Sequence, residues 1–134
     1  MLLGAVLAVA AAGTAAAAAT PAQVVRAWSR ALNANDNEQA AKLFARGARV
    51  VQPGIDVRLR THALALGFND ALPCAGRIVS IQVKGNRATA VFVLGQRPKH
   101  RCDAPGAKAA ALFVVRGGKI VGWQQVPVPS QPTA

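Results

Sequence analysis

Side chains that move protons are scarce in this chain of 134 residues, which has five acids and two histidines. Asp56 is followed by Arg58 and Arg60, and a carboxylate beside two cations could act near the mouth of a pocket. His62 could act as a base, because free imidazole titrates near neutral pH. Each candidate also has a simpler explanation as an exposed side chain, Asp56 beside an edge strand and His62 at the start of a helix.

Basic side chains are abundant, and the 16 lysines and arginines give a formal net charge of +11. Such a surface attracts polyanions, including nucleic acid, anionic lipid head groups and acidic envelope polymers. Within the densest run, 97–101, the candidates for binding an anion are Arg97, Lys99 and Arg101. The alternative is a solvated loop. Because no aromatic residue interleaves with the run, it indicates no specific nucleic-acid partner.

The chain has two cysteines, Cys74 and Cys102. In an exported protein an even number of cysteines predicts a disulfide. The alternative is a zinc site that includes the histidines. His100 and Cys102 are separated by only one residue, however, whereas structural zinc ligands usually come in pairs two to four residues apart. We predict a Cys74–Cys102 disulfide, no metal and no cofactor.

Residues 1–19 have the composition of an export signal. They carry no charge, and a short apolar run is followed by an alanine tract that suits a signal peptidase, although no basic residue precedes the run. The apolar part is too short to span a bilayer. We therefore expect a signal peptide at 1–19, a domain at 20–127 and a proline-rich tail at 128–134. Such a protein is secreted or held in the cell envelope.

Three helices are predicted in the first half of the domain. The first opens at Pro21 with Thr20 as its cap. The second ends at Gly47 and has Phe44 on its inner face. The third begins at Thr61, and its inward stripe consists of Leu64, Phe68 and Leu72.

Strands dominate the second half of the domain. Four long strands are predicted, at 77–84, 87–97, 107–116 and 119–126, and a short one precedes the third helix at 48–52. Two-residue turns join the long strands into two hairpins. Helices followed by antiparallel strands favour an α+β fold. None of the four long strands carries an acid, and Asp70 on the third helix is expected at the surface.

Residues at both ends of the domain carry a family resemblance. They are Trp28, 31–33, Asp36, 40–41, 43–45, Ala48 and Val50, followed by 117–121, Trp123 and Val126. Over about residues 21–127 the chain resembles the nuclear transport factor 2-like (SnoaL-like) superfamily. The resemblance implies a cone, in which three N-terminal helices pack on a strongly curved, mainly antiparallel sheet with a pocket between them. Many members form homodimers through the outer sheet face.

The resemblance leaves the function open, because members include enzymes, carriers and adaptors. Their enzymes place a carboxylate inside the cone, and the isomerases add a tyrosine, which this chain lacks altogether. We expect a non-catalytic domain that binds a small molecule or a partner through an apolar pocket. The alternatives are an isomerase, cyclase or hydrolase of a small apolar substrate, and a polyanion-binding protein of the cell envelope.

The expected pocket is walled by the first helix, the third helix and the concave sheet face, with Gln124 or Gln125 as a polar group. A mostly apolar lining with few polar groups suits a small apolar ligand. The alternative is that the large side chains simply fill the cone as core. These side chains are Trp28, Phe44, Phe68, Phe92, Phe113 and Trp123.

Overall fold

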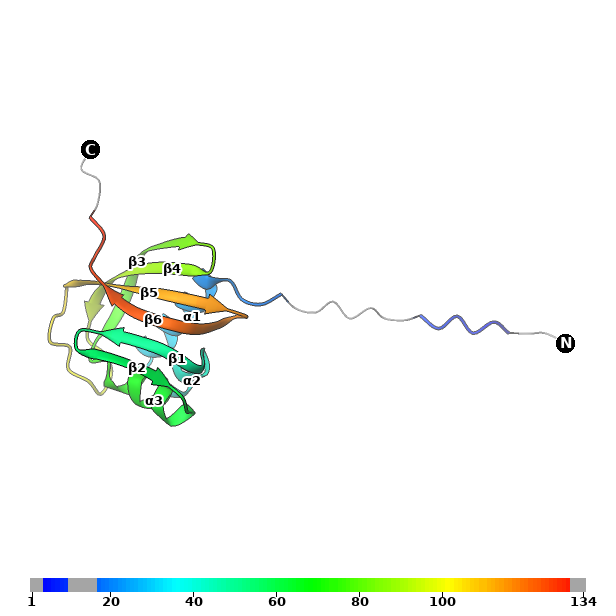
Figure 1. Ribbon diagram of the computed structural model, residues 1–134, viewed down its shortest axis with the longest axis horizontal. Coiled ribbons are helices and arrows are strands. Elements are labelled where there is room, and N and C mark those ends of the chain that lie inside the picture. Colours follow the sequence, from blue (N-terminus) through cyan, green and yellow to red (C-terminus); the bar gives the residue numbers. More distant parts are fainter. Residues whose placement is uncertain (1–3, 10–16, 131–134) are drawn as a thin grey trace.

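The computed structural model describes residues 4–9 and 17–130 (Figure 1). Parts of the expected signal peptide, 1–19, and of the proline-rich tail, 128–134, lie outside the described residues, and both segments stay predictions. Within the described ranges, no helix is long and apolar enough to cross a membrane.

The three predicted helices are present as α1 (Pro21–Asn33), α2 (Asn37–Lys42) and α3 (His62–Ala71). A reciprocal capping box starts α1. The Gln23 N–H donates to Thr20 Oγ1 at 3.2 Å, and the Thr20 N–H donates to Gln23 Oε1 at 2.9 Å. The start of this helix, as predicted from local sequence, is confirmed.

One mixed sheet follows the order β2-β1-β6-β5-β4-β3. Its neighbouring strands are antiparallel except for β1 and β6, which are parallel. The strands are β1 (Phe44–Gln52), β2 (Ile55–Leu59), β3 (Ala75–Lys84), β4 (Arg87–Gly95), β5 (Lys108–Arg116) and β6 (Lys119–Val126). The predicted α+β class with a mainly antiparallel sheet is confirmed.

The boundary between α2 and β1 differs from the prediction. The helix ends at Lys42, and Phe44 is the first residue of a strand. Gly47 has a φ of +79° and lies where the pairing of β1 with β6 changes register. The same glycine signal that ends a helix also permits a bulge in a strand, and here it marks the bulge.

The buried face of α3 also differs from the predicted stripe. Leu64 is 50% exposed, whereas Ala65 and Asn69 are buried. Asn69 Oδ1 accepts a hydrogen bond from the Trp28 indole at 2.8 Å, with Asn69 on the buried face of the helix. The buried polar residue is stable there because its hydrogen bonds are made inside the protein.

The helices lie on one side of the sheet, with α1 packed on β3, β4 and β5 (Figure 1). Aromatic rings pack against one another in part of the space between the two layers. Ring centroids are 5.3 Å apart for Trp28 and Phe113, and 5.2 Å apart for Phe68 and Trp123, in edge-to-face geometry. No helix packs on the other face of the sheet within the described chain.

Candidate functional site

A cavity of about 320 Å³ lies between α1 and the inner face of the sheet. This volume is within the range of small-molecule sites. One wall is α1 with Trp28 and Leu32, and the opposite wall includes Phe92 and the small side chains of Ala109 and Ala111 on β5. Because these side chains on β5 are small, the layers leave space beside the aromatic cluster.

A set of polar contacts at Gly76 fixes the cavity wall where α1 meets β3. Asn33 Nδ2 donates to the Gly76 carbonyl at 2.9 Å, and the Gly76 N–H donates to Asn33 Oδ1 at 2.9 Å. Ser29 Oγ donates to the same carbonyl at 3.3 Å. A Cβ on Gly76 would stand 3.0 Å from the Phe92 ring, so a glycine is required for this close approach.

Two tryptophans line the cavity, and their indole N–H groups differ. Trp28 donates to Asn69, as described above. The Trp123 Nε1 is buried and has no hydrogen-bond partner among the described residues. An unpaired buried donor costs about 1–3 kcal/mol.

All six predicted large side chains pack in or against the core, and some of them also line the cavity. Half of them line the cavity: Trp28, Phe92 and Trp123. The other three pack within the core: Phe44, Phe68 and Phe113. Of the two predicted glutamines, Gln125 lines the cavity and Gln124 does not.

Asp103 also lines the cavity, and sequence reasoning missed it. Cys74 and Cys102 form the predicted disulfide, which joins the start of β3 to the loop between β4 and β5. Asp103 Oδ1 consequently lies 3.8 Å from Cys74 Sγ. One sequence signal could have revealed Asp103. It directly follows Cys102, and the cysteine predicted to pair with Cys102 lies next to the start of β3.

The two catalytic candidates from the sequence are not part of the cavity lining. Asp56, on β2, accepts two hydrogen bonds from Arg49 at 2.9 and 2.7 Å, and these hold the pKa of Asp56 below its ordinary value. His62 Nε2 lies 2.7 Å from Glu38 Oε2, and both side chains are at least half exposed. The structure therefore does not bring Asp56 and His62 together or place either beside the cavity.

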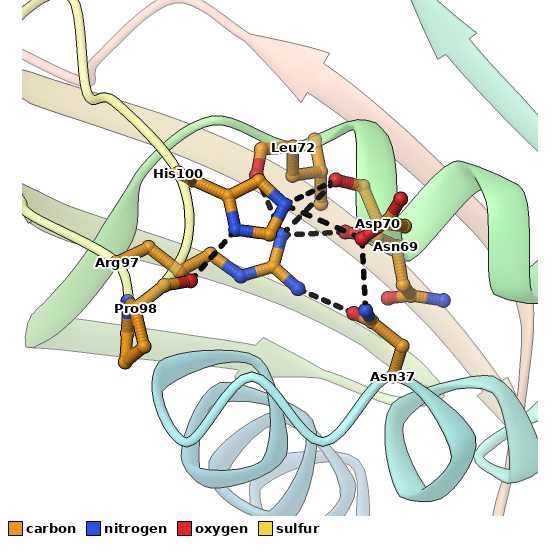
Figure 2. A network of polar contacts seen from close by, with 7 residues as sticks. All are labelled: Asn37, Asn69, Asp70, Leu72, Arg97, Pro98 and His100. Carbon is orange, nitrogen blue, oxygen red and sulfur yellow. Dashed lines mark hydrogen bonds and ion pairs between the residues drawn. The ribbon is translucent and has the colours of Figure 1, made fainter.

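The first residue of the predicted anion site, Arg97, contacts Asn37 and the end of α3 (Figure 2). Arg97 is buried, with 2% of its surface exposed. It donates to the carbonyls of Asn69 at 2.7 Å and Leu72 at 2.6 Å, and to Asn37 Oδ1. These carbonyls end α3, where helix geometry leaves acceptors unpaired. Arg97 is thus occupied by its own protein, which corrects the expectation of anion binding there.

Burial also shifts the pKa of Arg97 below its ordinary value, although the nearby Asp70 carboxylate opposes this change. Asp70 is exposed, as expected, and accepts from Asn37 Nδ2 at 3.1 Å. His100 Nε2 lies 2.7 Å from the Asp70 carbonyl, and its Nδ1 lies 2.8 Å from the Pro98 carbonyl (Figure 2). This network holds the loop before Asp103 against α3. The two other residues of the predicted anion site, Lys99 and Arg101, are exposed.

Comparisons with known proteins rest on structure alone, because neither a family model nor a curated protein matches the sequence. A nuclear transport factor 2-like protein of unknown function from Cytophaga hutchinsonii superposes with a TM-score of 0.66 at 13% identity, covering 80% of this chain and 88% of that one. A putative polyketide cyclase from Sinorhizobium meliloti gives a TM-score of 0.65 at 17% identity, covering 77% and 93%.

A third solved structure is a hypothetical protein from Catenulispora acidiphila with a ketosteroid isomerase-like fold, in complex with trimethylamine. It gives a TM-score of 0.62 at 22% identity, covering 81% of this chain and 87% of that one. At these identities the likeness concerns the fold and not the activity. The helices, the mixed sheet and these neighbours together show that the chain has the nuclear transport factor 2-like fold, an α+β cone.

Proposed function

We propose that this protein is a non-catalytic domain that binds a small, largely apolar molecule in the cavity between α1 and the sheet. The observation that carries the proposal is the cavity itself, which persists although the aromatic side chains also pack on one another. Its apolar walls favour an apolar ligand body. The unpaired Trp123 N–H favours a ligand with one acceptor, such as a carbonyl or ether oxygen.

Filling the cavity tests this proposal. Ala109 lines it and is half-buried, so Ala109→Phe should place a ring in the ligand's space. We expect binding of an apolar fluorescent probe to weaken at least about tenfold, a loss of about 1.4 kcal/mol. The matched control is Ala107→Phe, because Ala107 is exposed and lies outside the cavity. Equal binding by both variants would refute the proposal.

The acceptor on the ligand is tested separately with Trp123→Phe. This change removes the N–H and keeps an aromatic ring. A ketone ligand should lose affinity relative to a hydrocarbon of the same shape, because only the ketone accepts the hydrogen bond. Native mass spectrometry of the protein from its own host would then identify any ligand that purifies with it.

Asp103 supports a second candidate function, an isomerase, cyclase or hydrolase of a small apolar substrate. It is an acid that the structure places at the cavity, and a carboxylate there could accept a proton from a bound substrate. The test is turnover of ketone, epoxide or ester substrates by the wild-type protein and by Asp103→Asn. Turnover that Asp103→Asn abolishes would establish the enzyme and overturn the non-catalytic proposal.

A further inference from the structure

A second hollow lies on the outer face of the sheet, away from the ligand cavity. It is a groove of about 460 Å³. One wall is the segment 128–130 after β6. The other walls are side chains of β3, β4 and β5, among them Ser80, Gln82, Thr89, Val91 and Lys108. Ala90 and Phe92 belong to the core cluster on the helix side and Val91 between them does not, so alternation along β4 directs Val91 away from the helices.

Basic residues stand at both ends of this groove. At one end Lys84 pairs directly with Arg87 across the β3–β4 hairpin. At the other end Val93 is flanked by Arg77 on β3 and Lys108 on β5. All four basic side chains belong to exposed residues. The two ends are six residues apart along β4, or roughly 20 Å at strand geometry.

No acid balances these four charges on the strands that carry them. The sequences of β3, β4 and β5 contain neither Asp nor Glu. Asp56 lies on β2, at the opposite edge of the sheet, and is already paired with Arg49. The groove therefore has polar and apolar side chains along its length and uncompensated positive charge at both ends.

We propose that this groove binds a linear phosphate polymer lying along β3 and β4. The separation of the basic ends exceeds what one small anion can bridge, so the ligand must carry repeated charges. The hydroxyls of Ser80 and Thr89 and the amide of Gln82, which lie between the ends, are donors of the kind that phosphate oxygens accept. A second copy of this chain would bring the same uncompensated cations to the interface, and this opposes pairing through this face.

The same lining argues against a nucleic acid as the favoured polymer. Single strands are held mainly by bases stacked on aromatic rings. The residues that form the groove include no aromatic side chain. A phosphate chain without bases needs only the cations and the hydroxyl and amide donors that are present.

Binding of inorganic polyphosphate to the purified protein, measured by calorimetry over a range of salt concentrations, tests the proposal. Four phosphate contacts predict that affinity falls about 50-fold between 50 and 200 mM salt. Lys84→Gln/Arg87→Gln removes one end and should reduce this fall to about sevenfold. Arg77→Gln/Lys108→Gln should act likewise at the other end, so the test does not depend on one variant. The matched control is Arg26→Gln/Arg30→Gln, which removes the same charge from exposed positions on α1.

Each other outcome would overturn the proposal. Equal weakening by the α1 control would show that net charge attracts the polymer without a site. If single-stranded DNA binds more tightly than polyphosphate, the protein recognises bases. If a polyuronate binds as tightly as polyphosphate, the groove has no preference for phosphate. The groove variants should retain binding of the apolar probe, because they lie outside the cavity. That readout confirms their fold and separates this proposal from the one for the cavity.

Discussion

Replacing Arg97 with methionine tests whether a buried cation holds the end of α3. Methionine keeps an unbranched side chain and removes every donor. The two short bonds to the carbonyls of Asn69 and Leu72 have a charged donor and contribute about 1.5–3 kcal/mol each. Removing the guanidinium also relieves its desolvation cost, which offsets part of that loss. We expect the free energy of unfolding to fall by about 3 kcal/mol.

Urea denaturation with the disulfide intact measures this change. The midpoint urea concentration should fall, while the dependence of the unfolding free energy on urea concentration stays the same. Arg101→Met is the matched control, since Arg101 is exposed in the same loop, and it should change stability by less than about 0.5 kcal/mol. Arg97→Lys should fall between the two, because an ammonium lacks the planar fork that reaches two carbonyls together. If Arg97→Met is as stable as Arg101→Met, the carbonyls find other partners and the reasoning fails.

Three further changes test other parts of the structure. Replacing Cys74 and Cys102 together with serine opens a loop with a sequence separation of 28 and should lower the free energy of unfolding by about 3.6 kcal/mol in urea titrations. Asn69→Ala should lower it by about 1–3 kcal/mol, because the indole of a neighbouring tryptophan loses its buried acceptor; thermal unfolding measures this loss. The pKa of Asp56 is depressed in the folded state, so its ion pair stabilises the protein above pH 3.8 and this contribution disappears as pH falls further. Asp56→Asn should therefore be slightly less stable than wild type at neutral pH, and a series of urea titrations should show the two converge under acid.

Features set by neighbouring residues were predictable from the sequence. The capping box at the start of α1 depends on residues three apart, and the hairpins depend on their turn residues. The α2–β1 boundary was mispredicted because Gly47 permits a strand bulge as readily as a helix end. Only the pairing of β1 with β6, which joins residues far apart in the chain, decides between them.

The candidate site was harder to predict because its polar residues act across long sequence distances. Arg97 lies in a run of charges, which usually indicates a solvated loop, yet it is 2% exposed. Its burial depends on α3 ending opposite it, a contact between residues 25 to 28 apart in sequence. Asp103 is likewise carried to the cavity by the disulfide. The periodicity of apolar residues identified Trp28 and Phe92 as residues that line the cavity. That periodicity contains no information on the polar contacts of Arg97 and Asp103.

The place of β6 in the sheet has a consequence for how the chain folds. This strand is the last in sequence, yet it pairs with β1 on one side and β5 on the other. Among the described residues, the β1–β2 hairpin therefore joins the rest of the sheet through the strand that is made after the other five. A nascent chain that stops before Lys119 lacks the strand that connects the two parts. The sheet is therefore completed through a pairing between residues far apart in sequence, and contacts of that kind slow folding.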